Sequence, residues 1–368
     1  MDIVSVLLSF LPPIVILWLA NLADRRLAGP EPGAEGRLRV VANFPKVGTP
    51  DEGRRILSLL SYALIAGLFG LLIMGGLIAS AAGWLWQQPG AAEGAEMYRE
   101  LGMDPAILPN LGLALWLPSV FGIVLLLRPS RRLLSRLIPI DPHSVVHAIA
   151  LSYTMLVTTN LLATLGFGLG NVARQLEQLG PINIMPALWV QEALMALMAL
   201  VGVGWLARRG LASALARLAI VRPTLRQVAL GVGGGAALAG LILGVELLVS
   251  RAGISAGADV EKLSEQLLGP LMKTWAGIIT VGAAAALGEE PIFRGALQPR
   301  FGLLLTSVLF ALLHSTYGLS IATIFVFVVG MVLGLVRQRA NTTTTMLMHA
   351  AYNMTLGTVS YLGLLRDL

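Results

Sequence analysis

Long apolar runs recur along the chain, and shorter polar segments containing arginine, glycine and proline separate them. Each run has about 17 residues or more, the length that a helix needs to cross the hydrocarbon core of a membrane. We expect about ten such spans, which are Ile3 to Ala20, Ile56 to Trp86, Leu111 to Leu127, Ser144 to Gly170, Pro186 to Ala207, Val228 to Val249, Pro270 to Gln298, Phe301 to Tyr317, Leu319 to Val336 and Thr342 to Gly363. The pattern therefore predicts an all-α fold, a polytopic transmembrane helical bundle.

The composition agrees with this prediction, because 56% of the residues are hydrophobic and only 12% are charged, with a mean hydropathy of +0.79. A net charge of +6 would suggest nucleic-acid binding in a soluble protein, but here the basic residues gather at the ends of the apolar runs. Basic residues in that position set the orientation of membrane helices. We therefore expect the lipid bilayer, and no nucleic acid, as a partner. The lack of cysteine excludes disulfides and thiol catalysis.

The basic residues also predict an orientation. If the loop from Asp24 to Arg55 is cytoplasmic, most of the 26 lysine and arginine residues fall on that side, in alternate loops. The positive-inside rule then puts the N-terminus outside. A composition rich in alanine, glycine, leucine and arginine favours a bacterial source. We expect an integral protein of the bacterial cell (inner) membrane.

Charged residues interrupt the apolar run that begins at Trp275. Glu289, Glu290 and Arg294 lie in it, although an ionisable side chain at the centre of a membrane helix costs roughly 2.5 kcal/mol or more. Glu290 and Arg294 are four residues apart and can pair on one face, whereas Glu289 points about 100° away. Pro291 lacks an amide hydrogen and should disturb the helix. Such costly residues indicate a functional site.

Two later spans carry polar side chains at helical spacing. Phe310 and His314 share one helix face, as do His349 and Asn353. At about 1.5 Å of rise per residue from the cytoplasmic ends of their helices, Glu289, His314, His349 and Asn353 lie roughly 11 to 20 Å deep. These four side chains can converge near the middle of the membrane if their helices are neighbours.

The three motifs together resemble those of the CPBP membrane proteases, which comprise type II CAAX prenyl endopeptidases and bacteriocin-processing or bacteriocin-immunity proteins. The family pattern is a Glu-Glu pair followed by Arg, then Phe-x-x-x-His, then His-x-x-x-Asn, and this chain has all of them in that order. The resemblance covers Gly269 to Leu365. We therefore expect catalytic helices at residues 269–368 and an N-terminal transmembrane region, of about six helices, at residues 1–268.

The resemblance implies hydrolysis of a peptide bond within the membrane. Glu289 and His314 would hold and deprotonate a water molecule. His349 and Asn353 would donate hydrogen bonds to the oxyanion of the tetrahedral intermediate. The implied substrate is a membrane-embedded or lipidated peptide, which in this family can be a prenylated CAAX-type sequence.

The resemblance leaves the role of a metal open. In a metal-free mechanism, which we favour, Glu290 and Arg294 form the structural pair that orients Glu289. In the alternative, Glu289, His314 and His349 bind zinc and leave one position open for water.

Two other interpretations stay open. The buried polar residues could hold the helices together without turnover, or they could relay protons in a membrane transporter. Glu192 and Glu246 also lie in predicted spans, but neither has an evident partner nearby in the sequence.

Overall fold

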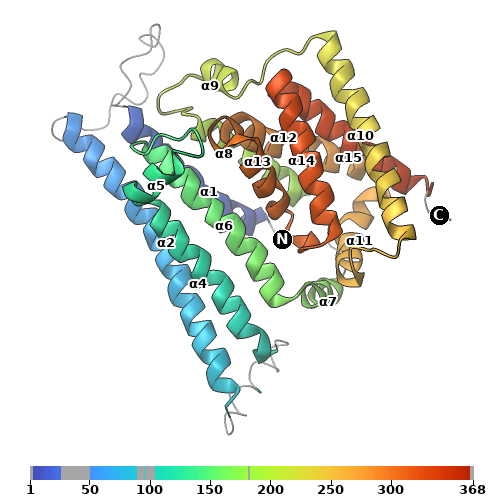
Figure 1. Ribbon diagram of the computed structural model, residues 1–368, viewed down its shortest axis with the longest axis horizontal. Coiled ribbons are helices and arrows are strands. Elements are labelled where there is room, and N and C mark those ends of the chain that lie inside the picture. The colour runs from blue at the N-terminus through green and yellow to red at the C-terminus, as the bar shows by residue number, and fades with distance from the viewer. Residues whose placement is uncertain (1–2, 26–49, 89–95, 97–103, 181–182, 365–368) are drawn as a thin grey trace.

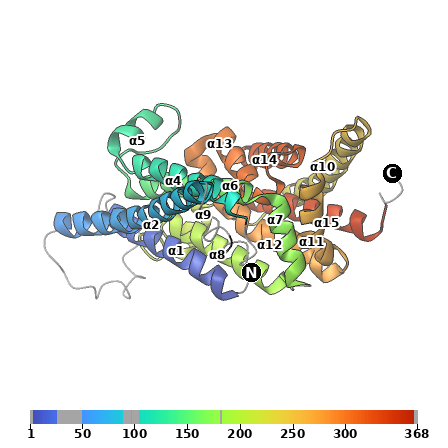
Figure 2. The ribbon, with the colours of Figure 1, turned by 90° about the horizontal axis from the view of Figure 1, so that it is seen from below.

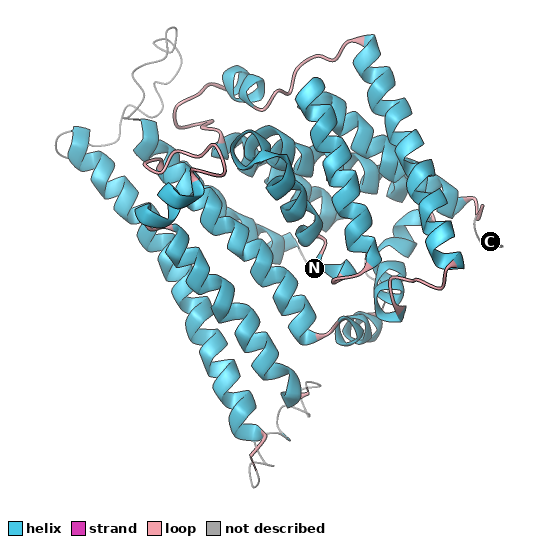
Figure 3. Ribbon diagram, viewed as in Figure 1, coloured by secondary structure: helices cyan, strands magenta, loops and turns pink. Residues whose placement is uncertain are grey.

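A computed structural model describes residues 3–25, 50–88, 96, 104–180 and 183–364 (Figure 1). Its regular structure is helical, and no strand occurs in these ranges (Figure 3). The helices in chain order are α1 (Ile3–Arg25), α2 (Pro50–Trp86), η3 (Pro105–Ile107), α4 (Leu108–Leu125), α5 (Arg128–Leu134), α6 (Val145–Phe167), α7 (Leu169–Leu179), α8 (Met185–Gly202), α9 (Leu211–Arg217), α10 (Leu225–Arg251), α11 (Ala258–Met272), α12 (Trp275–Glu290), η4 (Pro291–Leu297), α13 (Gln298–Leu313), η5 (Ser315–Tyr317), α14 (Ile321–Arg339) and α15 (Thr342–Tyr361). The predicted all-α bundle is confirmed.

Each predicted apolar run corresponds to a helix, but the number of candidate spans differs from the prediction. Eight helices in the described ranges are long and apolar enough to cross a membrane. One of them, Trp275–Leu313, is a 39-residue unit that joins two predicted spans through α12, η4 and α13. The last predicted span, α15, is not among the eight, and the run of threonines with which it begins makes it more polar. Most of the basic loop predicted at 24–55 lies outside the described residues.

Helix α8 connects two groups of helices. On one side α1, α2, α4 and α6 pack against one another, and α8 packs against α1 (Figures 1 and 2). On the other side, α8 packs against α12 and η4, which in turn contact α13, α14 and α15. Helix α10 packs along α15 at the edge of the molecule (Figure 1). Two helices of the predicted N-terminal region, α8 and α10, are thus direct neighbours of the C-terminal helices.

Glycine residues let α10 approach α15 closely. A Cβ atom added at Gly235 would lie 2.3 Å from the Met348 carbonyl oxygen, and one at Gly231 would lie 2.7 Å from Leu347 Cβ. Small residues allow this kind of backbone approach between membrane helices. The contact fixes the part of α15 that immediately precedes His349.

The start of α15 is anchored to the segment that follows α9. The Thr342 amide donates to the Ala219 carbonyl at 3.0 Å, and the Thr342 hydroxyl donates to the Leu218 carbonyl at 2.6 Å. The Asn341 side chain caps the helix by accepting from the Thr344 amide at 2.8 Å. These bonds fix the position of α15 along its own axis.

The prediction that Pro291 disturbs its helix is confirmed. The α-helical pattern of α12 ends at Glu290, and the seven-residue π-helix η4 follows before α13 begins. Short π-helical segments are rare and often lie at functional sites. A second break occurs at Gly302, whose φ of 76° lies in the left-handed region that glycine adopts readily.

Candidate active site

The junction of α12 and η4 carries three buried charged side chains. Glu290 is fully buried, and Glu289 is only 7% exposed. The predicted pair is present, since Arg294 Nε lies 3.5 Å from Glu290 Oε2. Arg294 also donates to the Gly330 carbonyl of α14 at 3.3 Å, and its guanidinium carbon lies 4.3 Å from the centre of the Phe310 ring. An isolated buried charge is costly, so the two charges of this pair stabilise each other.

His349 of α15 reaches both glutamates. Its Nδ1 lies 3.0 Å from Glu290 Oε1, which is hydrogen-bond distance, and its Nε2 lies 4.0 Å from Glu289 Oε2. In either protonation state, Nδ1 of His349 can donate a hydrogen bond to the Glu290 carboxylate. If the imidazole is neutral, Nε2 carries no hydrogen and can only accept; if it is doubly protonated, Nε2 is a second donor. Glu290 therefore orients the imidazole with Nε2 towards Glu289. The sequence predicts that His349 and Glu289 converge, but it does not predict the contact with Glu290.

His314 lies where α13 ends, and Phe310 connects it to the rest of the site. Its Nδ1 is 2.9 Å from the Phe310 carbonyl oxygen, so Nε2 is the nitrogen left for water or substrate. The centre of the Phe310 ring lies 5.2 Å from that of His314 and 5.9 Å from that of His349. The Tyr317 ring stacks on His314 at 5.9 Å. Phe310 thus contacts both histidines.

Asn353 lies one turn beyond His349 on α15, and its amide bonds to a neighbouring helix. The Nδ2 atom donates to the Val281 carbonyl of α12 at 3.3 Å. Val281 precedes Glu289 by about two helical turns, so this bond ties α15 to α12. The amide has a second hydrogen, and the predicted role in an oxyanion hole would use that one.

Some buried carboxylate oxygens at this junction lack a hydrogen-bond partner within the described residues. Among them are Oε2 of Glu289 and Oε2 of Glu192. A buried acceptor without a donor costs about 1–3 kcal/mol. A water molecule or a substrate group that donates to Glu289 Oε2 would remove this cost.

Glu192 of α8 is a neighbour of the site that the sequence left unassigned. Its side chain is 2% exposed, and its Oε1 accepts from Gln191 Nε2 at 3.1 Å. A Cβ atom added at Gly288 would lie 2.2 Å from Glu192 Oε2, so the carboxyl group packs against the backbone just before Glu289. Only the acidic character of Glu192 within an apolar run could have indicated this position. Glu246, the other unassigned glutamate, lies on the exposed side of α10.

The three residues considered as zinc ligands are not arranged as a metal site. In the described ranges, no group of three or more histidine, aspartate or glutamate side chains could hold a metal ion. Glu289 and His349 approach each other, while the His314 ring packs on Phe310 and Tyr317. These residues therefore do not fit a zinc ion in the positions that they have here.

The helices define a polytopic membrane protein, and its buried cluster brings together carboxylates, imidazoles and an amide, the kinds of polar group that hydrolytic sites use. Residues 271–355 match the family model described as type II CAAX prenyl endopeptidase Rce1-like. The match contains all six residues predicted for the site, and it confirms the resemblance to the CPBP intramembrane proteases. No curated protein and no solved structure matches the chain.

Proposed function

We propose that the protein is an intramembrane endopeptidase that hydrolyses a peptide bond of a membrane-associated or lipidated substrate, including a prenylated CAAX-type peptide. The observation that carries the proposal is the position of His349, which bonds to Glu290 and faces Glu289 Oε2, an oxygen with no hydrogen-bond partner among the described residues. A base and a potential proton donor thus face the same small space. The family match over these residues supports a peptidase.

Glu289 is the general base in this proposal. Its Oε2 accepts a proton from a water molecule held between Glu289 and His314 Nε2, and the water oxygen attacks the carbonyl carbon of the scissile bond. The tetrahedral intermediate then collapses, the C–N bond breaks, and Glu289 returns the proton to the leaving amine. A positioned general acid or base of this kind contributes about 10²–10⁴-fold to the rate.

His349 and Asn353 stabilise the oxyanion. A doubly protonated His349 donates from Nε2 to the oxyanion while its Nδ1 stays on Glu290, and Asn353 supplies its second amide hydrogen. One such donor stabilises the transition state by about 3–4 kcal/mol. Glu290 and Arg294 are positioning residues, because they act through the imidazole and touch no reacting atom.

The two predicted regions have different tasks in this proposal. Residues 269–368 supply the catalytic groups, and residues 1–268 supply α8, whose Glu192 packs on Gly288, the residue before Glu289. We assign the basic loops to the cytoplasmic side and the N-terminus to the outside of a bacterial inner membrane. The substrate then enters from the membrane or from its cytoplasmic face.

The test is cleavage of a farnesylated C-terminal peptide by purified protein in detergent. Wild type is compared with Glu289→Gln, which keeps the shape of the side chain but removes the base. The matched control is Glu177→Gln, the same exchange at an exposed glutamate of α7. Cleavage by wild type and by the control, but not by Glu289→Gln, supports the proposal. Equal cleavage by all three proteins contradicts it, as does proton-coupled uptake of a solute that depends on Glu289.

A second assay identifies the substrate if wild type does not cleave this peptide. The same three proteins are produced in cells that lack the native protein, and the membrane peptides of the cells are compared by mass spectrometry. A peptide that is cut with wild type and with Glu177→Gln, but not with Glu289→Gln, is a substrate.

A further inference from the structure

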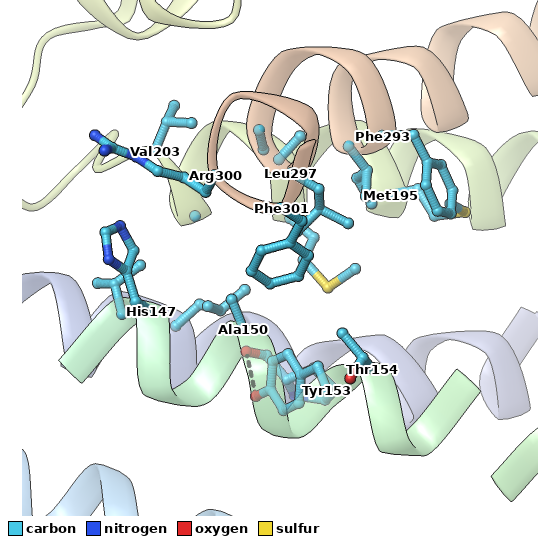
Figure 4. A pocket seen from close by; sticks show the side chains of 18 of the residues that line it. His147, Ala150, Tyr153, Thr154, Met195, Val203, Phe293, Leu297, Arg300 and Phe301 are labelled. Carbon is cyan, nitrogen blue, oxygen red and sulfur yellow. Dashed lines mark hydrogen bonds between the residues drawn. The ribbon is translucent and has the colours of Figure 1, made fainter. Parts of the chain in front are cut away.

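A cavity of about 790 Å³ lies between α1, α6, α8 and the bend formed by η4 and α13 (Figure 4). Its volume is within the usual range of ligand pockets, about 300–1,000 Å³. Most of the lining is apolar. In Figure 4, Met195, Phe293, Leu297 and Phe301 lie on one side and Tyr153 on the other. This size and lining suit a hydrocarbon chain.

Helix α6 supplies one wall along the length of the cavity. His147, Ala150, Thr154, Val157 and Asn160 line it and follow one another at intervals of about one helical turn. At about 1.5 Å of rise per residue, this stripe is roughly 20 Å long. One leaflet of a membrane has a hydrocarbon thickness of about 15 Å, half of the hydrocarbon core. The cavity is therefore long enough for the tail of a membrane lipid.

One end of the cavity is basic, and we call it the basic mouth. Four arginines line it, namely Arg208, Arg209, Arg217 and Arg300. In Figure 4, Arg300 lies at this end and Phe293 at the opposite one. Burial lowers the pKa of Arg217, and the positive charges of Arg300 and Arg209 lower it further. Among the described residues, no carboxylate forms an ion pair with Arg209, Arg217 or Arg300. An anion placed here would reduce the repulsion between the arginines.

The aspartates near the basic mouth are engaged with the backbone at the start of α6. Asp24 accepts from the Ser144 hydroxyl at 2.6 Å and from the Val145 amide at 3.0 Å. Asp141 accepts from the His143 amide at 2.8 Å. Both carboxylates thus have donors of their own. Arg209 and Arg217 each donate one N–H group to a backbone carbonyl, of Val203 and Gly295 respectively. Their other N–H groups, with those of Arg300, can bind an anionic group from outside the protein.

The cavity is separate from the candidate active site. None of the six predicted site residues, all of which the structure describes, lines it. Phe293 does line it, and the Phe293 ring packs edge to face on Phe310 at 5.3 Å between centres. Phe310 in turn contacts His314 and His349. Two aromatic rings therefore form a wall between the cavity and the site.

We propose that this cavity binds one membrane lipid with an anionic phosphate headgroup. The tail lies along the stripe of α6, and the phosphate lies among the arginines of the basic mouth, because guanidinium groups bind phosphate through paired hydrogen bonds. The lipid is a resident ligand and is not the peptide that is cut. The proposal does not rest on the peptidase function, since the cavity and its arginines are separate from Glu289 and its neighbours.

Lipid titration tests the headgroup. Delipidated protein in neutral detergent is titrated with phosphatidylglycerol or with phosphatidylcholine of the same acyl chains, and bound lipid is counted by native mass spectrometry. We expect one tightly bound phosphatidylglycerol, with an affinity about tenfold or more above that of phosphatidylcholine. Arg217→Gln/Arg300→Gln should lower this affinity about 25-fold, at about fivefold for each charge removed. Arg132→Gln/Arg136→Gln, at two exposed arginines that do not line the cavity, should leave it unchanged.

A second pair of variants tests the tail. Ala150→Phe fills part of the stripe on α6 and should weaken the binding of both lipids. Ala81→Phe, on the exposed side of α2, should leave the binding of both unchanged. Only variants that keep the melting transition of wild type are compared, so a misfolded protein is not mistaken for one that has lost its ligand.

Three results would overturn the proposal. Equal affinity for both lipids in wild type and in both arginine variants would show a cavity that accepts any acyl chain. Glycerol phosphate that binds as tightly as the lipid would show a site for free phosphate. Displacement of the lipid by an equimolar farnesylated peptide would make the cavity part of the substrate site. Glu289→Gln should bind lipid as wild type does, so failure of the peptidase proposal would leave these results unaffected.

Discussion

His349 Nδ1 lies 3.0 Å from Glu290 Oε1, and this contact joins α15 to the point where α12 changes into η4. The other carboxylate oxygen of Glu290 faces Arg294. Glu290 therefore lies between an imidazole and a guanidinium, with one oxygen directed to each. We expect it to act on the reaction through the orientation of His349.

Removing both members of the buried pair of Glu290 and Arg294 should destabilise the fold by less than the sum of the two single removals. Glu290→Ala leaves a buried guanidinium without its carboxylate, and breaking one side of a buried pair costs about 3–5 kcal/mol. In Glu290→Ala/Arg294→Met the unpaired charge is gone, so the loss in free energy of unfolding should be smaller than the sum of the two single losses. Denaturant unfolding in detergent measures all four proteins, and strictly additive losses would contradict the interaction.

Phe310→Leu should lower activity while the protein stays folded. The exchange removes the ring that contacts both His314 and His349, and a displacement of about 1 Å in a catalytic group can reduce the rate about 10²-fold. The loss in free energy of unfolding should be only about 1–2 kcal/mol. Measurements of kcat/KM and Tm compare it with Phe325→Leu on α14, which should keep full activity. A fall in activity that merely follows the fraction of unfolded protein would argue against this role of Phe310.

Gly288→Ala should destabilise the packing of α8 on α12. The added Cβ would lie 2.2 Å from Glu192 Oε2 and 2.7 Å from the Glu192 carbonyl oxygen, and the backbone cannot move aside as a flexible side chain can. Overpacking of this kind costs about 1–3 kcal/mol. Gly233→Ala on α10, where no atom lies within 4 Å of the added Cβ, should be neutral or stabilise the helix by about 0.5–1 kcal/mol. Equal thermal shifts for the two variants would refute the close approach.

Peptide cleavage should resist zinc chelators. Glu289, His314 and His349 lie within the described residues, which contain no group of ligands that could hold a metal ion. The measurement is the rate with and without a chelator, together with the metal content of the purified protein. Activity that a chelator abolishes and added zinc restores would replace the metal-free mechanism with the zinc alternative.

The contact between α7 and α11 should weaken in acid. Lys262 Nζ lies 2.8 Å from Glu177 Oε2, and this hydrogen bond, together with the positive charge, lowers the pKa of Glu177 below its usual value. A carboxyl group whose pKa is lower in the folded state stabilises that state at pH values above its unfolded-state pKa. This contribution is lost as the pH falls through the folded-state pKa. Both side chains are exposed, so the effect is local and small.

Hydrogen exchange of the α7 amides, corrected for the intrinsic exchange rate, should therefore become faster as the pH falls through the folded-state pKa of Glu177. Glu177→Gln should show the faster exchange at neutral pH already and little further change in acid. The same pH response in wild type and in the variant would assign the effect to another group.

The sequence predicts the helices well, because a membrane span is predominantly apolar whatever its neighbours are. It also predicts the pair of Glu290 and Arg294, since two residues four apart meet on a single helix. Pro291 indicates a break in the helix. The π-helical form of that break depends on the surrounding helices, and the proline alone does not specify it.

Contacts between helices could not be predicted in the same way. The bond from His349 to Glu290 and the packing of Glu192 on Gly288 depend on which faces of separate helices meet. Asn353 is a further example. Its spacing from His349 predicts that both lie on one face of α15, but it does not predict the hydrogen bond from the Asn353 amide to Val281. The motifs thus indicate which residues gather, and the packing of α8, α12 and α15 determines how each one is used.

The rings of Phe293 and Phe310 connect two compartments. One ring lines the cavity and the other touches both histidines, and close-packed rings in contact cannot move independently. A lipid that shifts Phe293 would press on Phe310, which contacts both His314 and His349. The lipid composition of the membrane would then regulate hydrolysis as an allosteric effector, without contacting the scissile bond.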